Sequence, residues 1–351
     1  SGGAAGPAII GSGIVASIMG QAVSNVVLTG RLTVPMMRKY GYKGSMAGAI
    51  EATASTAGQI MPPIMGLAAF IIASFLNKAY IDVALSALIP GLLYLVGVCI
   101  AVTVYARRYE LPKLVEKVDT ERIKRLLPTF IISFGVVLWL LLGYRSPAIA
   151  GLWGIALAIL FSMLQGKYRP TRKQMYDAIQ EGFYLVAILS LLLVAVGPLG
   201  QVMLTTNLSG RLGSALVQYL PDTQLILLIG AMIVSLILGM GLPTPVAYII
   251  VALALVPFMQ QIGIPPLQAH FFVFYFAVFS TLTPPVAVSV LAAAKLGEAT
   301  FLSTAKDAIK IALTTFIIPF AFVFSPELMS FPDVTLATLI AVAEVIFVQV
   351  A

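Results

Sequence analysis

Residues 54–63, ASTAGQIMPP, place oxygen-bearing groups and two prolines inside a long apolar stretch. Pro62 and Pro63 remove two backbone N–H donors and clash with the preceding turn, so a continuous helix cannot pass through them. A broken helix leaves carbonyl oxygens bare at the end of one half and N–H groups bare at the start of the other. The carbonyl end suits a hard cation and the N–H end suits a carboxylate. We therefore predict that this break supplies oxygens to a sodium ion, from Ser55, Thr56, Gly58 and Gln59.

A second stretch repeats this arrangement. SIMGQAVSN (17–25) and LGMGLPTPV (238–246) both carry Met-Gly followed by a short polar turn. The first leads to Pro62–Pro63, 42 positions after Gly20, and the second leads through VFSTLTPPVA to Pro284–Pro285, 43 positions after Gly241. Each unit therefore predicts a helical hairpin, then a broken helix, then a further span. The oxygens predicted at the first tip come from residues 20–25, and those of the second unit come from Gly239, Gly241, Thr244, Ser280, Thr281 and Thr283.

The composition indicates that these breaks lie in a membrane. The chain has 351 residues, 60% hydrophobic and 10% charged, with a mean hydropathy of +1.02. Soluble domains carry roughly 25% charged residues, so we predict an all-α integral membrane protein. The single cysteine, Cys99, excludes a disulfide framework, and the single histidine, His270, excludes a histidine-rich metal site. The chain opens on Ser-Gly-Gly rather than Met, so we expect a processed or trimmed product.

The apolar segments divide into spans and interrupted regions. A helix needs about 20 residues to cross a bilayer. We expect crossings near 82–105, 128–143, 147–165, 176–197, 308–325 and 335–351. The regions 5–36 and 223–262 have Gly-rich or Pro-rich centres, and we expect each half to be too short to span alone, which predicts re-entrant hairpins. The regions 45–76 and 266–296 are the two broken helices.

The distribution of basic residues supports these crossings. If the first hairpin returns to the cytoplasm, the loops 31–43, 106–127, 166–175 and 295–310 all lie inside and hold 18 of the 21 Lys and Arg residues. Such a bias follows the positive-inside rule. The first hairpin then enters from the cytoplasm and the second from outside, so the units are inverted repeats. Inverted repeats with broken helices are typical of secondary transporters.

The predicted organisation has four parts. Residues 1–81 and 223–298 form the transport domain, each contributing a hairpin and a broken helix. Residues 82–222 hold scaffold spans, a basic cytoplasmic loop (107–125, expected as an amphipathic surface helix) and an amphipathic segment near 200–222, and residues 299–351 form C-terminal scaffold spans. By symmetry we expect that an N-terminal scaffold precedes residue 1 or lies on another polypeptide.

The run MGQAVSNVVLTGRLTVPMMRKYGYKGSMAGAIEATASTAGQIMPPI, with LGMGLPTPVAYII and STLTPPVAVS, resembles the large membrane subunit of tripartite ATP-independent periplasmic (TRAP) transporters. It is most similar to the branch served by TAXI-type binding proteins, and the resemblance covers essentially the whole chain. The resemblance implies an elevator mechanism and sodium-driven uptake of an organic acid across the bacterial inner membrane. It also implies a periplasmic binding protein and a small membrane subunit, separate or fused.

The expected ligands follow from both lines of reasoning. The resemblance implies sodium ligation by Ser24, Gly58, Met61 and Pro62 in one half and by Gly241, Ser280, Thr283 and Pro284 in the other. The tips add Gly20 to the first site and Thr244 to the second. An anionic substrate between the tips would contact Gln21, Ser24, Asn25, Gln59, Thr244 and Thr281. No cofactor other than the coupling ions is expected.

Two titratable residues have alternative interpretations. Glu51 lies seven positions before Gly58 on the same helical face. We prefer a hydrogen-bonded carboxylate near the cytoplasmic end, with a proton or cation relay as the alternative. For His270, near the outer interface, a packing role is preferred over a functional one.

Other functions are less consistent with the sequence. A binding-protein-independent sodium/dicarboxylate carrier of similar architecture remains an alternative. An intramembrane enzyme is not expected, because the chain has no HExxH, no GxSxG and no pair of mid-membrane aspartates. A channel is disfavoured because occluding tips indicate alternating access.

Overall fold

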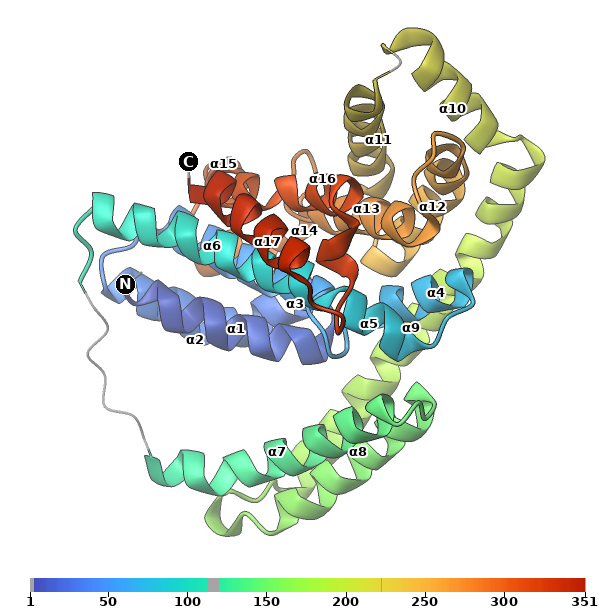
Figure 1. The fold of residues 1–351 in the computed structure, drawn as a ribbon. Coiled ribbons are helices and arrows are strands. Elements are labelled where there is room, and N and C mark those ends of the chain that lie inside the picture. Colours follow the sequence, from blue (N-terminus) through green and yellow to red (C-terminus); the bar gives the residue numbers. More distant parts are fainter. Residues whose placement is uncertain (1–2, 113–119, 222, 351) are drawn as a thin grey trace. The chain divides into compact units, whose positions relative to one another are not determined.

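The computed structural model describes residues 3–112, 120–221 and 223–350, and within these ranges the chain forms helices, turns and loops (Figure 1). Of the helix expected over 107–125, residues 113–119 lie outside the described ranges. The described part is not one helix, because α6 (Leu88–Arg108) ends at its start and α7 (Thr120–Leu142) begins at its end. The chain divides into two compact units. Unit 1 comprises Ser1–Lys78, Asp82–Leu114 and Val196–Ala351, and unit 2 comprises Ala79–Ile81 and Val115–Ala195. Both interrupted repeats therefore belong to unit 1.

The first repeat is a helical hairpin followed by a broken helix. Its elements are α1 (Ala5–Met19), α2 (Ala22–Lys39), α3 (Gly44–Ile60) and α4 (Gly66–Leu76). Every α3 residue from Met46 to Ile60 is buried, because α1, α2, α6, α14 and α15 all pack against this helix. The hairpin turn at 20–21 and the break at 61–65 fall where the sequence predicts them.

The second repeat has the same order of elements. They are α11 (Gln224–Gly239), α12 (Thr244–Gln261), α13 (Pro266–Phe279) and α14 (Val288–Leu296). Every α13 residue from Gln268 to Phe279 is buried. Its phenylalanines meet the following helices: Phe279 stacks on Phe316 with ring centroids 4.6 Å apart, and Phe272 packs edge-on against Phe320 at 5.3 Å. The run FFVFYFAVF (271–279) is thus a packing core.

The remaining helices of unit 1 flank the repeats. They are α6 (Leu88–Arg108), α10 (Leu208–Tyr219), α15 (Phe301–Ala312), α16 (Ile317–Phe324) and α17 (Leu336–Val350), with short 3-10 turns at Leu313–Thr315 and Pro326–Met329. Helix α6 lies beside α17 (Figure 1), and Gln349 Nε2 donates to the Leu93 carbonyl at 3.2 Å. The short α5 (Tyr80–Ser86) precedes α6, so the span expected over 82–105 begins later, at Leu88.

Unit 2 is built from α7 (Thr120–Leu142), α8 (Pro147–Met163) and α9 (Arg172–Thr205) as far as Ala195, with the 3-10 turn Gly166–Tyr168 between α8 and α9. Helices α7 and α8 lie side by side (Figure 1). Ser146 starts α8 as its N-cap, because its hydroxyl accepts from the Ile149 N–H at 3.3 Å and Pro147 needs no partner at the first position. Trp139, Leu152 and Phe183 are each at least 70% exposed.

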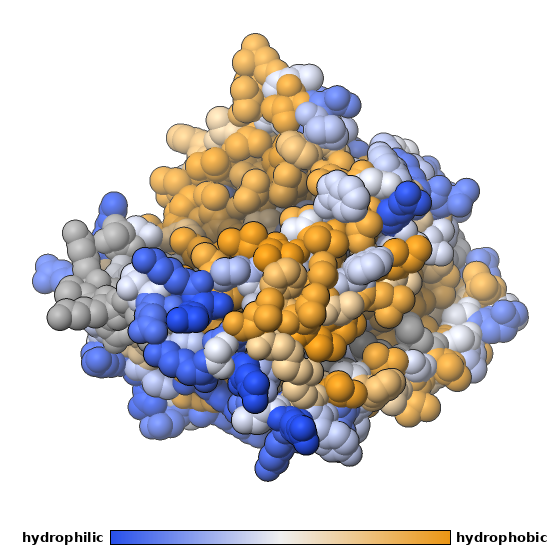
Figure 2. Space-filling view, turned by 90° about the horizontal axis from the view of Figure 1, so that it is seen from below, coloured by the Kyte–Doolittle hydropathy of each residue, from blue (hydrophilic) through white to orange (hydrophobic). Residues whose placement is uncertain are grey.

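The surface and helix lengths are those of a membrane protein. Figure 2 shows broad hydrophobic areas beside clusters of hydrophilic residues. Within the described residues four helices are long and apolar enough to cross a membrane, or five if one bent pair counts as a span. One of them is α12, with 18 residues, so our expectation that each half of 223–262 is too short to span is wrong for this half. Pro245 lies in the first turn, where its missing N–H is tolerated, so the helix continues from there.

Candidate functional site

The two breaks have the same backbone plan. Both Pro62–Pro63 and Pro284–Pro285 are cis peptides. Three residues after the first proline of each pair, Met65 (φ 54°) and Ala287 (φ 38°) adopt the left-handed conformation. Each is the N-cap of the second half-helix, and each is fully buried. The two breaks are therefore matched in backbone conformation as well as in sequence.

The prolines expose main-chain carbonyls at the end of each first half-helix. Without an N–H, Pro62 and Pro63 cannot close the bonds to the carbonyls of Gly58 and Gln59, four residues earlier. In the same way, Pro284 and Pro285 cannot donate to the carbonyls of Ser280 and Thr281. The Thr281 carbonyl instead accepts from the Ser289 N–H at 3.2 Å. No charged residue occurs in 54–66 or 280–288. The breaks thus present neutral oxygens.

The first hairpin tip packs against the first break through glycine backbone. A Cβ on Gly20 would lie 2.2 Å from Gly66 Cα, and one on Gly58 would lie 2.1 Å from the Ala16 carbonyl carbon. Gly20 also has a left-handed φ of 61° and ends α1 by donating its N–H to the Ala16 carbonyl at 2.7 Å. These contacts leave no space for a side chain, so the backbone of the tip packs directly against the backbone of the break.

The second hairpin tip contacts the second break through Ser280. The Ser280 hydroxyl donates to the Gly239 carbonyl at 2.9 Å and also lies 2.7 Å from the Ala277 carbonyl. A Cβ on Gly239 would lie 2.8 Å from Ser280 Oγ. Gly241, at the tip, has a left-handed φ of 75°. The structure thus joins Gly239 and Ser280, as the sequence predicts for one set of oxygens.

The two halves meet at a buried hydrogen bond. Thr244, the first residue of α12, donates from Oγ1 to Gln59 Oε1 of the first break at 2.8 Å. Gln59 is 3% exposed and Thr244 is 7% exposed. Nearby, Tyr94 on α6 donates to the Thr53 carbonyl at 3.0 Å and stacks on Phe279, the last residue of α13. The two breaks therefore belong to one region of unit 1.

The other predicted site residues have local partners. Ser24 Oγ donates to Gln21 Oε1 at 2.7 Å within the first tip. Thr281 and Thr283 donate to the carbonyls of Val278 and Phe279 on their own chain segment, at 2.8 and 3.2 Å. Met61, Pro62 and Thr283 are partly exposed, and Pro284 is exposed.

Asn25 belongs to a different cluster from the one predicted for it. Its Nδ2 donates to the hydroxyls of Ser12 and Ser55 at 2.8 and 2.9 Å. Both hydroxyls lie next to Glu51 Oε1, at 2.8 and 3.1 Å. The hydrogen bonds predicted for the Glu51 carboxylate are present. Thr29 and Thr33 complete this cluster and were not predicted. The spacing of four residues between Asn25, Thr29 and Thr33 places all three on one helical face and could have indicated them.

His270 packs among aromatic rings. Its Nδ1 lies 2.7 Å from the Tyr248 hydroxyl, and its ring stacks on Phe75 with centroids 5.6 Å apart. All three belong to unit 1, and the contact agrees with the preferred packing role. Among the described residues no group of three or more His, Cys, Asp or Glu side chains could hold a metal ion.

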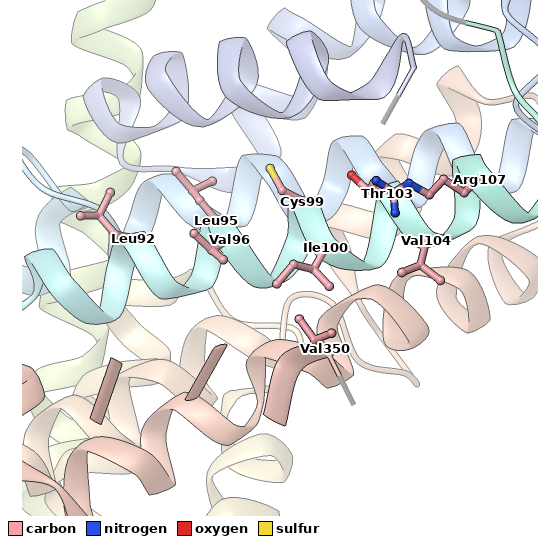
Figure 3. A pocket seen from close by; sticks show the side chains of 9 residues that line it. All are labelled: Leu92, Leu95, Val96, Cys99, Ile100, Thr103, Val104, Arg107 and Val350. Atoms are coloured by element: carbon pink, nitrogen blue, oxygen red, sulfur yellow. The ribbon is translucent and has the colours of Figure 1, made fainter. Parts of the chain in front are cut away.

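A groove of about 440 Å³ lies along α6 but does not fit the predicted site (Figure 3). Its lining is apolar except for Thr103, Arg107 and the Cys99 thiol. None of its lining residues belongs to a hairpin tip or a break. We therefore assign the candidate site to the tips and breaks rather than to this groove.

Comparison with known proteins agrees with this geometry. Residues 1–334 match the family model described as tripartite ATP-independent periplasmic transporter, DctM component. Similar proteins include the sialic acid TRAP transporter permease protein SiaT of Haemophilus influenzae, 23% identical over 92% of this chain and 52% of that protein. They also include the 2,3-diketo-L-gulonate TRAP transporter large permease protein YiaN of Escherichia coli (23%, 92% and 76%) and the uncharacterized protein y4mL of Sinorhizobium fredii (22%, 85% and 73%). The chain thus spans about half the length of SiaT and about three quarters of the other two. The repeated order of hairpins and breaks agrees with this match over nearly the whole chain. We conclude that the chain belongs to the family of DctM components of tripartite ATP-independent periplasmic transporters, which are transporters and not enzymes.

Proposed function

We propose that this chain carries an organic acid anion across the bacterial cytoplasmic membrane, coupled to sodium, by an elevator motion of its two repeats. The observation that carries the proposal is the Thr244–Gln59 hydrogen bond, which joins the second hairpin to the first break. It brings two matched broken helices into one buried region. Paired broken helices at a repeat interface are the usual substrate and ion sites of secondary transporters.

Sodium is the coupling ion that fits the oxygens at the breaks. Hard cations prefer oxygen ligands, and neutral carbonyls and hydroxyls suffice for a monovalent ion. The first proposed site uses Gly20, Ser24, Gly58, Met61 and Pro62. The second proposed site uses Gly241, Thr244, Ser280, Thr283 and Pro284.

An anionic substrate would lie between the tips. The second half-helices α4 and α14 begin at the breaks, and their first N–H groups carry partial positive charge. Gln21, Ser24, Gln59, Thr244 and Thr281 would add side-chain contacts. Asn25 is the weakest member of the predicted set, because its amide nitrogen already serves Ser12 and Ser55.

The proposed partners follow the family and the sequence resemblance. The substrate would be delivered by a periplasmic binding protein of the TAXI type, and a small membrane subunit would complete the scaffold. Relatives are named for sialic acid and for 2,3-diketo-L-gulonate, two organic acids. These names support an organic acid as the substrate class of this chain.

Uptake into proteoliposomes tests the proposal. The binding protein encoded nearby is first screened with organic acids by thermal shift, and uptake of the acid it binds is then measured with and without a sodium gradient. We expect uptake only with both sodium and the binding protein. Uptake without the binding protein would instead favour a solitary sodium/dicarboxylate carrier.

Two substitutions test the ion sites. We expect Ser24→Ala and Thr283→Ala each to raise the sodium concentration that gives half-maximal uptake. Thr205→Ala is the control, because Thr205 is exposed and its hydroxyl bonds only to carbonyls of its own helix. Unchanged sodium dependence in both site variants would contradict the assignment.

A further inference from the structure

Glu51 is a buried carboxylate with no counter-ion. Its side chain is 0% exposed. None of the ion pairs found among the described residues includes it. Burying an ionised carboxylate without a cation costs several kcal/mol, and in a membrane such residues are typically functional. The group therefore needs an explanation beyond packing.

Four hydroxyls surround the carboxylate and can donate to it. Oε1 lies 2.8 Å from Ser12 Oγ, 2.5 Å from Thr29 Oγ1 and 3.1 Å from Ser55 Oγ. Oε2 lies 2.5 Å from Thr33 Oγ1. Hydroxyl donors stabilise the ionised form. When Glu51 carries its negative charge, all four hydroxyls therefore have a carboxylate oxygen as acceptor.

The same heavy atoms also suit a neutral Glu51. Thr29 Oγ1 lies 2.8 Å from the Asn25 carbonyl and Thr33 Oγ1 lies 3.1 Å from the Thr29 carbonyl, so each threonine has a second acceptor. When Oε2 carries the proton, Oε1 is a carbonyl oxygen and still accepts from Ser12 and Ser55. The Asn25 amide keeps its orientation, in which Nδ2 donates to both hydroxyls and to the Ser12 carbonyl. Every hydroxyl of the cluster therefore keeps a hydrogen bond when the carboxyl group is neutral.

The cluster leaves room for a proton but not for a metal ion. Its oxygens touch one another at 2.5–3.2 Å. A Cβ on Gly30 would lie 3.1 Å from Glu51 Cγ and 2.8 Å from Leu296 Cδ1, so the surroundings are closely packed. A sodium ion would have to push these oxygens apart, whereas a proton needs no space.

We infer that Glu51 is a reversible proton-binding site in the interface between the first hairpin and α3. A proton from water binds Oε2, the new O–H donates to Thr33 Oγ1, and the Thr33 hydroxyl hydrogen turns to the Thr29 carbonyl. Thr29 and Thr33 are partly exposed and connect the buried carboxyl group to the surface of α2. Ser12, Thr29 and Thr33 lie on the hairpin, while Glu51 and Ser55 lie on α3, so the proton changes the bonds that join these elements.

The other titratable groups near α3 have different contacts. Helices α1 and α4 carry none. The charged residues on α2, α14 and α15 are Arg31, Arg38, Lys39, Lys295, Lys306, Asp307 and Lys310. Helix α6 carries Tyr94, Cys99, Tyr105, Arg107 and Arg108, and α13 carries His270 and Tyr275. Asp307 accepts from Ser45, Arg38 pairs with Glu298, and Tyr94 donates to Thr53. None of them forms a hydrogen bond or ion pair with Glu51, whose side-chain partners are the four hydroxyls of the cluster.

Infrared spectroscopy of the full chain in lipid tests this site without transport. Spectra recorded across a pH titration are expected to show a protonated-carboxyl carbonyl band that disappears as the pH rises. We expect Glu51→Gln to lose this band and Glu344→Gln to keep it, because Glu344 is exposed on α17. In Thr33→Val the band should shift in frequency, because the protonated group loses Thr33 Oγ1 as the acceptor of its O–H. That variant keeps the test valid if Glu51→Gln does not fold.

Two results would overturn the inference: a band unchanged in Glu51→Gln, or a band frequency unchanged in Thr33→Val. The proton site does not depend on the proposed function. Only the further step, in which this proton moves together with the substrate, rests on that function. A protein that fails to transport can still show the band, and one that transports can lack it. The two failures are therefore distinguishable.

Discussion

The hydrogen bond between Thr244 and Gln59 offers a direct test of how the two repeats meet. Thr244→Val keeps the shape of the side chain and removes the hydroxyl. Gln59→Met keeps an unbranched side chain of similar length and removes the acceptor. Because the two residues are 185 positions apart in sequence, a free-energy coupling between these substitutions would have to come from contact in the folded protein.

The expected magnitudes follow from the burial of both groups. Thr244 Oγ1 and Gln59 Oε1 are 2.8 Å apart, and both side chains are more than nine-tenths buried. Thr244→Val leaves the Gln59 oxygen without this donor, which costs about 1–3 kcal/mol. Gln59→Met removes the oxygen as well, so the double variant should lose less than the two single losses together. Couplings across such bonds in membrane proteins average roughly 0.6 kcal/mol and reach about 1.7.

The assay is reversible unfolding of the purified protein in mixed micelles, with the four members of the cycle compared under one condition. Thr314→Val is the matched control, because the Thr314 hydroxyl donates only to the Ile311 carbonyl nearby. Combined with Gln59→Met, it should give additive losses. Additive losses in the Thr244–Gln59 cycle would refute the contact between the second hairpin and the first break.

Two further predictions concern glycine packing and surface charge. Gly58→Ala should lower the melting temperature strongly, since its Cβ would lie 2.1 Å from the Ala16 backbone. Gly11→Ala is the control and should not lower it, because a Cβ there would have nothing within 4 Å. Equal effects of the two substitutions would contradict the close approach at Gly58. The Arg38 hydrogen bond and, next, its charge lower the pKa of the Glu298 carboxyl, so this pair's stabilisation is present above the ordinary pKa of glutamate and is lost as the pH falls through the lowered value. Melting temperatures of wild type and Glu298→Gln should therefore differ slightly at neutral pH and converge in acid, and a difference that grows in acid would contradict this sign.

The breaks and tips were predictable from sequence because their causes are local. Two prolines remove two N–H donors wherever the chain lies, so the ends of α3 and α13 follow directly from Pro62–Pro63 and Pro284–Pro285. The turn at Gly20 follows from Met-Gly and the polar residues after it. The matched left-handed residues, Met65 and Ala287, were not predicted, because neither is a residue type that favours this conformation.

The partners of the site residues were not predictable in the same way. Asn25 was expected to meet substrate, yet its amide faces Ser12 and Ser55 because α1, α2 and α3 pack around Glu51. Which face of α2 meets α3 depends on tertiary packing, and a helix that is apolar around most of its surface gives little indication of it. The hydrogen bond between Thr244 and Gln59 was likewise not predictable. Both are predicted site residues, but no local sequence pattern indicates that they contact each other.

The two repeats are also joined away from the breaks. A Cβ on Gly44, at the start of α3, would lie 2.0 Å from the Gly297 carbonyl oxygen, and one on Gly48 would lie 2.9 Å from the Ala293 carbonyl oxygen. Arg38 and Glu298 pair beside these contacts at 2.9 Å. Backbone contacts of this kind resist sliding. They favour a motion in which both repeats move as one body over a motion in which one repeat rocks against the other.

Cross-linking at the Arg38–Glu298 pair separates these two motions. In a Cys99→Ala background, Arg38→Cys and Glu298→Cys would be joined by a short bifunctional thiol reagent, with each single-cysteine variant treated in the same way as a control. If both repeats travel together, their relative position does not change during transport, so uptake should survive the cross-link. Uptake lost only in the cross-linked double variant would refute the one-body motion and show that the repeats must separate at this end during each cycle.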